Sequence, residues 1–295
     1  MSKECNGQKM DALHYTISRY RKIYPAYLVS FLVTFLMLVI AEKNTLFEIY
    51  IRLIDSFWEI IAMQGIGLAR DWNYINPTVW YISVLFLAGH LIYYLLSKHR
   101  ELFVNLIAPG AIIVIYSYLY RYQGNLDAVT QMDGFYVNYQ LMRGFADMCI
   151  GVYAYLFTSY LKEHMTDQSY YVLKVTGVLG FLYVIISSVT IGYTRTDFMY
   201  VFILAYSVAV AFIPSKHTVP GIIMGISEIT LEAYLLHEVY RNVIFAHYFN
   251  CEGRGILQKL GYLIVYLLIV FISAFVLNRG LRLIRSSGLK GIKEA

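Results

Sequence analysis

Three basic side chains stand close together near the start of the chain, where they are able to bind a polyanion. Arg19, Arg21 and Lys22 lie within four residues of one another and precede Pro25 and a long apolar run. Arginine binds phosphate oxygens through two parallel N–H bonds, and lysine adds a point charge. Basic residues beside a membrane span also mark its cytoplasmic side. The cluster therefore indicates either an anion-binding site at a membrane surface or a topology signal alone.

A second group of ionisable side chains lies inside the apolar segment 219–245. It contains three glutamates, a histidine and an arginine: Glu228, Glu232, Glu238, His237 and Arg241. A charge in hydrocarbon costs a few kcal/mol, so such side chains face a polar cavity or one another. We expect this segment to line a polar interior, in which His237 acts as a base, a hydrogen-bond donor or a structural anchor.

Arg143 and Asp147 open another apolar segment at the i, i+4 spacing that suits a mutual ion pair. The pair either contributes to a substrate cavity or only neutralises itself and positions two helices. No HExxH, CxxC or paired-histidine spacing indicates a metal site, and no metal is predicted. Neither a serine-hydrolase elbow nor a P-loop or dinucleotide fingerprint occurs.

The composition indicates a membrane protein that has to position these groups with helices. Hydrophobic residues make up 59% of the 295 residues, charged residues only 15%, and the mean hydropathy is +0.55. Soluble domains usually carry about 25% charged residues. The net charge of +5 does not indicate nucleic-acid binding, because the bases lie in loops beside apolar segments.

The apolar segments predict an all-α, polytopic membrane protein with about eight transmembrane helices, since a helix needs about 20 apolar residues to cross the hydrocarbon core. The predicted spans are 23–41, 79–96, 103–120, 141–161, 171–191, 198–213, 219–245 and 256–278. Without an internal repeat or a low-complexity tract, the chain is predicted to be one membrane domain, 1–295.

The distribution of basic residues predicts a cell-membrane protein with both termini in the cytoplasm. The segment 1–22 and the tail 279–295 are both basic, and the loops predicted on the same side hold Lys98, Arg100, Lys162 and Lys216. The opposite loops are poorer in bases and include the long segments 42–78 and 121–140.

The first outer loop is predicted to contain an amphipathic helix of its own. Glu48, Arg52, Asp55 and Glu59 recur at steps of four, three and four residues, which places them on one stripe. The other faces of this helix are apolar, so we expect it to lie on the outer membrane interface or to pack over the bundle.

Four stretches resemble the acyltransferase-3 family of integral membrane O-acyltransferases. They are the basic run Arg19 to Tyr27, the run Asn76 to Ser83 that contains Pro77 and Trp80, the run Arg143-Gly144-Phe145 to Gly151, and the run Thr230 to His237 that contains Tyr234. They occur in the order found in the family, and together they extend over nearly the whole chain.

The resemblance implies that an acyl group, often acetyl, moves from cytoplasmic acyl-CoA to a hydroxyl of a cell-surface or envelope carbohydrate. Acyl-CoA is then the donor substrate, and no bound cofactor is expected. Arg19, Arg21 and Lys22 are the expected donor-binding residues. The expected cavity-lining or acceptor-binding residues are Trp80, Arg143, Glu232, Tyr234 and His237.

The family's catalytic histidine lies on a helix that precedes the basic element, and here only about 22 residues precede the first predicted span. No catalytic residue is assigned, and we expect the chain to be a fragment or an inactive member. Two other functions stay open: a transporter or flippase-like component for a lipid-linked glycan, and a non-catalytic membrane partner.

Overall fold

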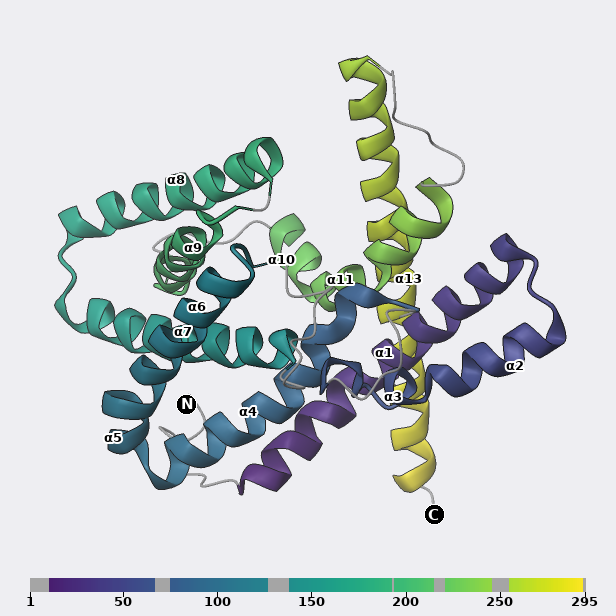
Figure 1. Ribbon diagram of the computed structural model, residues 1–295, viewed down its shortest axis with the longest axis horizontal. Helices are drawn as coiled ribbons and strands as arrows, with labels where there is room; N and C mark the ends of the chain where they lie inside the picture. The colour runs from purple at the N-terminus through teal and green to yellow at the C-terminus, as the bar shows by residue number, and fades with distance from the viewer. Residues whose placement is uncertain are drawn as a thin grey trace. The chain divides into compact units, whose positions relative to one another are not determined.

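The computed structural model describes residues 11–66, 75–126, 138–192, 194–214, 221–245 and 255–293 (Figure 1). Within these ranges the regular structure is helical and no strand occurs, which confirms the all-α prediction. Five of the described helices are long and apolar enough to cross a membrane: Ala12–Glu42, Trp80–Lys98, Arg100–Tyr122, Asp167–Ser188 and Leu257–Ile284.

The α-helices follow the predicted apolar segments. In chain order they are α1 (Ala12–Glu42), α2 (Leu46–Asp55), α3 (Phe57–Ile60), α4 (Trp80–Lys98), α5 (Arg100–Leu102), α6 (Ala108–Tyr122), α7 (Tyr139–His164), α8 (Asp167–Ile191), α9 (Asp197–Ala211), α10 (Gly221–Glu228), α11 (Thr230–Val239) and α13 (Ile256–Lys293). Short 3₁₀ turns, η1 (Gln64–Ile66) and η2 (Pro77–Val79), precede α4, and π-helical segments, η3 (Phe103–Ile107) and η4 (Tyr240–Phe245), follow α5 and α11.

The chain divides into two compact units. Unit 1 comprises Met1–Ile17, Gly65–Gly67 and Ser83–Thr218, and unit 2 comprises Ser18–Gln64, Leu68–Ile82 and Val219–Ala295. Because α1 and α4 each contribute residues to both units, the division does not follow a linker. The prediction of a single membrane domain stays a prediction.

In unit 1, helices α8 and α9 pack at close range because α8 presents glycines to α9 (Figure 1). A Cβ on Gly177 would lie 2.9 Å from a methyl group of Val210, and one on Gly180 would lie 2.7 Å from the Ser207 hydroxyl. The Lys174 amine donates to the carbonyls of Val210 and Ile213 at 3.0 and 2.8 Å. One cationic side chain of α8 therefore caps the carbonyl end of α9.

In unit 2, α11 packs against the long helix α13, and the short helices α2 and α3 pack against α1 (Figure 1). Phe31 and Phe35 of α1 form an apolar cluster with Ile75, against which Ile49 of α2 and Ile60 of α3 pack. This cluster fixes α3 and the chain before α4 beside α1.

The predicted outer-loop helix is shorter than its polar stripe indicated. Helix α2 begins with a capping box between Thr45 and Glu48 and ends at Asp55. The Ser56 hydroxyl donates to the Arg52 carbonyl at 2.7 Å, and the backbone then leaves helical geometry. Glu59 consequently falls on the separate helix α3, and at 2% exposure it is a buried side chain.

Candidate functional site: a buried polar network on helix α11

The seventh predicted span is not one continuous helix. Helix α10 ends at Glu228, Ile229 takes φ −111° and ψ 6°, and the helix resumes at Thr230. After Val239 the chain continues as the π-helical segment η4. π-Helical turns inside α-helices are frequent at functional sites, and they change which side chains share a face. Helix α11 is therefore a short, separately oriented segment.

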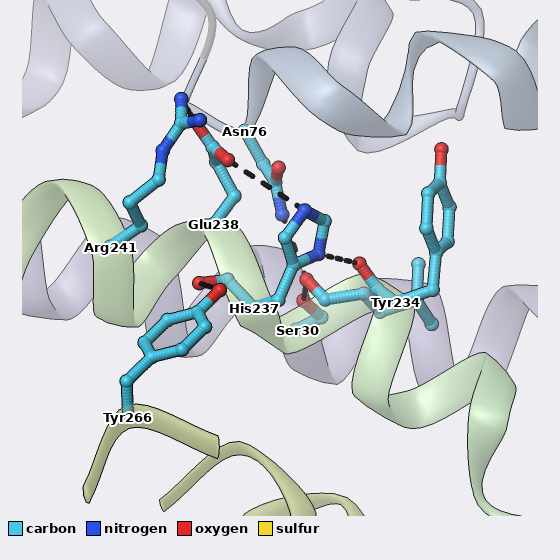
Figure 2. A network of polar contacts seen from close by, with 8 residues as sticks. Ser30, Asn76, Tyr234, His237, Glu238, Arg241 and Tyr266 are labelled. Atoms are coloured by element: carbon cyan, nitrogen blue, oxygen red, sulfur yellow. Dashed lines mark hydrogen bonds and ion pairs between the residues drawn. The ribbon is translucent and has the colours of Figure 1, made fainter. Parts of the chain in front are cut away.

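One carbonyl of α11 accepts hydrogen bonds from two distant parts of the chain. The Ser30 hydroxyl of α1 donates to the Leu235 carbonyl at 2.7 Å, and the Asn76 side-chain amide donates to the same carbonyl at 2.9 Å (Figure 2). Ser30 and Asn76 are 1% and 2% exposed, and Leu235 is fully buried. A buried polar group that loses its partner costs about 1–3 kcal/mol. These two bonds therefore fix α11 against α1 and against the segment before α4.

Asn76 is in turn held by a buried carboxylate outside the candidate membrane spans. Glu59 accepts from the backbone N–H groups of Ile75 and Asn76 at 2.8 and 2.6 Å. The Tyr27 hydroxyl of α1 donates to the Glu59 backbone carbonyl and, at 3.3 Å, to the Gln64 side chain. Burial raises the pKa of Glu59 to about 7, although the two N–H bonds act in the opposite direction.

The His237 ring is oriented by its own helix. Its Nδ1 lies 2.6 Å from the Tyr234 carbonyl, and its Nε2 lies 3.7 Å from the Glu238 carboxylate (Figure 2). Because a carbonyl only accepts, Nδ1 carries a proton, and Nε2 is the ring nitrogen that faces the carboxylate. Glu238 also pairs with Arg241, and the Tyr266 hydroxyl of α13 donates to the His237 carbonyl at 3.2 Å. The arrangement suits proton acceptance at Nε2 next to a carboxylate that stabilises the imidazolium.

The opposite side of α11 carries a second polar contact with α13. Asn278 donates its amide to Glu232 at 3.0 Å, and Arg282 pairs with Glu228 of α10 at 2.8 Å. Glu232 is 6% exposed. Glu232 thus accepts a hydrogen bond between α11 and α13. Tyr234 and His237 lie about 60° apart around the axis of α11, on a different face from Glu232.

The three predicted donor-binding residues are all exposed on α1 and do not form one patch. Arg19 and Lys22 are three residues apart and share a side of the helix, whereas Arg21 lies about 200° around the axis from Arg19. The helix continues through Pro25 although Pro25 has no N–H to donate. The geometry brings together Arg19 and Lys22 and leaves Arg21 apart.

The remaining two predicted residues lie in different units. Trp80, 8% exposed, begins α4 in unit 2, where its ring meets that of Tyr81 edge to face at 5.6 Å. Arg143 belongs to unit 1, where it lies 3.4 Å from Asp147 and donates to the Leu126 carbonyl. It lines a pocket of about 330 Å³ together with Ser188, Asp197 and Tyr200.

Glu59, Ser30 and Asn76 are parts of the network that the sequence did not identify. The local sequence around each residue gives no sign of the network. Glu59 continues the period of the α2 stripe, and Ser30 is an isolated hydroxyl in an apolar run. Asn76 stands before Pro77, where a turn residue is ordinary. Only the burial of all three distinguishes them.

No model of a protein family, no curated protein and no solved structure matches this chain.

Proposed function

We propose that this protein is a membrane O-acyltransferase component that uses cytoplasmic acyl-CoA, with acetyl as the acyl group, and a carbohydrate hydroxyl as acceptor. The observation that supports the proposal most directly is the pair of hydrogen bonds that the Leu235 carbonyl accepts from Ser30 and Asn76. Ser30 follows the first stretch that resembles acyltransferase-3 proteins, Asn76 begins the second, and Leu235 lies in the fourth. Residues of the second and fourth stretches, and Ser30 just beyond the first, therefore meet at one buried atom.

The proposed topology has eight spans, with both termini in the cytoplasm of a cell whose plasma membrane holds the protein. The spans are α1, α4, α5 with α6, α7, α8, α9, α10 with α11, and α13. Helix α9 has only 15 residues, which gives about 22 Å and requires a locally thin or adapted bilayer. Basic residues beside the proposed inner ends of the helices support this orientation.

Helix α2 is proposed to lie flat on the outer membrane interface. Its apolar side chains recur at helical spacing and are exposed: Leu46, Phe47, Tyr50, Leu53, Ile54 and Phe57, the last just beyond its end, at 44–86%. Glu48, Arg52 and Asp55 occupy the opposite face, and Arg52 pairs with Glu42 at 2.7 Å. A soluble surface rarely exposes a continuous apolar stripe of this kind, whereas an interfacial helix buries it among lipid chains.

For the donor, we assign the phosphate contacts of acyl-CoA to Arg19 and Lys22, which share a side of α1. Arg21 lies on another side of α1, and we assign it a smaller contribution to donor binding. Ser30 lies eight to eleven residues further along α1, which is about 12–16 Å of helix. One continuous helix, α1, thus carries both the proposed donor-binding side chains and Ser30, which belongs to the α11 network.

For the acceptor, we assign His237, Tyr234 and Trp80 as site-lining residues in unit 2. The lone pair on His237 Nε2 suits a hydrogen bond from a sugar hydroxyl, and the aromatic rings suit the apolar face of a sugar. Glu232 supports α11 through Asn278. Arg143 is assigned to acceptor binding through the pocket in unit 1, and no described residue is assigned as the catalytic base.

The test is acetyl transfer from labelled acetyl-CoA to carbohydrate in membranes that contain the protein. Arg19→Ala/Lys22→Ala is expected to lower transfer at limiting donor by about 10-fold or more, because two charge-assisted contacts of the donor are lost. Arg21→Ala is the matched control, one basic residue of the same helix, and is expected to lower it by less than threefold. Equal effects of the two variants would remove the donor assignment.

The interrupted seventh span favours one alternative, a transporter or flippase-like component for a lipid-linked glycan. Transporters often place their substrate at discontinuous helices, and the α10–α11 break at Ile229 is such a discontinuity. A transporter moves its substrate across vesicle membranes without acyl-CoA, whereas an acyltransferase releases CoA. A non-catalytic partner does neither and co-purifies with another protein.

A further inference from the structure

A groove on unit 1 has an apolar floor and a basic mouth. It lies between α6 and α9, is open to the surface and has a volume of about 860 Å³. Ile113 of α6 and the rings of Phe198 and Phe202 of α9 line it on the apolar side, and Arg121 and Arg195 line it at the end where α6 finishes and α9 begins. The groove is thus amphipathic along its length.

Aromatic rings hold the two helices apart and form the base of the groove. The Tyr116 ring meets the rings of Phe198 and Phe202 edge to face at 5.6 and 6.2 Å, and Tyr120 meets Phe198 at 5.4 Å. The Arg195 guanidinium lies over the Tyr120 ring, 5.2 Å from its centre. Ring contacts of this kind keep the guanidinium at the mouth and leave its N–H groups able to bind an anion.

Two acidic side chains of the described residues near the groove, Asp197 and Asp147, have other partners. Asp197 accepts from the backbone N–H groups of Leu126 and Thr194, both at 3.2 Å. Asp147 accepts from the Tyr116 hydroxyl and pairs with Arg143. Within the part of the chain that the structure describes, neither arginine of the groove forms an ion pair with a carboxylate. Among the described residues, the mouth therefore holds two arginines that no carboxylate pairs with.

We propose that this groove binds one anionic phospholipid, with its phosphate between Arg121 and Arg195 and an acyl chain along Ile113, Phe198 and Phe202. The chemistry is complementary at both ends: guanidinium groups bind phosphate oxygens in bidentate fashion, and the aliphatic and aromatic floor suits a hydrocarbon chain. The volume is within the range of about 300–1,000 Å³ found for small-molecule sites. The inference depends on the membrane location and not on acyl transfer.

Native mass spectrometry of the full protein in detergent tests the proposal, with phosphatidylglycerol and phosphatidylcholine of equal chain length as the probes. The wild type is expected to retain one phosphatidylglycerol more tightly than phosphatidylcholine. Arg121→Gln/Arg195→Gln is expected to weaken phosphatidylglycerol binding by about 10-fold or more, because two phosphate contacts are lost. Excess inorganic phosphate is expected not to displace the lipid, since it lacks the chain.

Two further variants distinguish binding in the groove from non-specific electrostatic attraction of an anionic lipid to the protein. Arg279→Gln is the matched control, because Arg279 is also exposed and lies over an aromatic ring, that of Phe275 at 5.2 Å, but lines no part of this groove. Ser117→Trp fills the floor and keeps both charges, so it is expected to expel the lipid while Arg279→Gln retains it.

Equal binding of the two lipids by the wild type, or loss of phosphatidylglycerol from Arg279→Gln to the same extent, overturns the proposal. The Ser117→Trp result stands by itself if the double variant does not fold, and unchanged lipid binding in that variant overturns the proposal as well.

Discussion

Replacing Glu59 by glutamine is expected to remove a pH dependence of stability. Glu59 is 2% exposed on α3, outside the candidate membrane spans, and its carboxylate accepts from the N–H groups of Ile75 and Asn76. Burial raises its pKa from the ordinary 4.5 to about 7. The Glu59→Gln side chain is neutral at every pH, so the pH dependence of the stability difference between wild type and variant reports the cost of the buried charge.

The sign follows from proton binding. Between pH 4.5 and pH 7 the folded protein keeps the Glu59 proton and the unfolded chain has lost it, so stability falls as the pH rises through this window. Above pH 7 the carboxyl is ionised in both states, and below pH 4.5 it is protonated in both. One pKa unit corresponds to about 1.4 kcal/mol, which gives a loss of about 2–3 kcal/mol between pH 5 and pH 8.

The variant loses one hydrogen-bond acceptor, because the glutamine NH₂ group meets an N–H that the carboxylate had bonded. This costs about 1–3 kcal/mol at any pH. We therefore expect Glu59→Gln to be less stable than the wild type at pH 5 and to approach it at pH 8.

The assay is thermal unfolding of the purified protein in detergent, followed by fluorescence at pH 5 to pH 8. For a chain of this size 1 kcal/mol shifts the midpoint by about 2–4 °C, so the gap between wild type and variant should narrow by about 5–10 °C across the range. Glu163→Gln, at an exposed glutamate of α7, is the control and should follow the wild type. A gap that stays constant with pH would refute the reasoning.

Further substitutions test the packing within each unit by the same unfolding assay. Gly144→Ala should destabilise the protein by about 1–3 kcal/mol, because the new Cβ would lie 2.2 Å from a methyl group of Val84. Gly151→Ala on the same helix meets nothing within 4 Å and should stabilise by up to about 1 kcal/mol; equal effects of the two would contradict the close packing. Lys174→Met keeps the stem and removes the donors that cap α9, at a cost of about 1–3 kcal/mol, and an unchanged midpoint would show that the cap is not needed. Asn76→Ala should cost a similar amount and should be non-additive with Ser30→Ala, since both side chains donate to one carbonyl; strict additivity in the double variant would argue against a shared acceptor.

Most of the helices were predictable from the sequence because a membrane-type helix is one long apolar run. All eight predicted segments have helical counterparts, and α9 is short, as the segment 198–213 indicated. Helix α1 extends further than predicted, from Ala12, because the basic run before Pro25 is itself helical. Because the run is helical, Arg19 and Lys22 lie on one side of α1 and Arg21 lies on another.

The breaks in the helices were not predictable from composition. Ile229 interrupts the seventh segment without a glycine or a proline, and Ser56 ends α2 by bonding back to the preceding turn. The periodicity of the polar stripe continued across Ser56, so the pattern assigned Glu59 to the polar stripe of the same helix. A single residue of non-helical geometry changes the direction of the side chains that follow it, relative to those before it. No local sequence pattern identifies such a residue.

The candidate site was partly predictable. The charged residues of the seventh segment do form polar contacts in unit 2, as we expected of charged side chains in an apolar segment. The contact of Ser30 with the Leu235 carbonyl joins residues 205 positions apart, and such pairings arise from tertiary packing alone. Trp80, Tyr234 and His237 lie in unit 2 and Arg143 in unit 1, so the resemblance grouped residues that belong to different units.

The most direct test of the proposed function is a titration of the purified protein with acetyl-CoA by calorimetry. We predict saturable binding of one acetyl-CoA per chain that free CoA competes away and that Arg19→Ala/Lys22→Ala weakens. Absence of saturable binding to the folded wild type, verified by its thermal unfolding transition, would contradict the assignment of acyl-CoA as the donor.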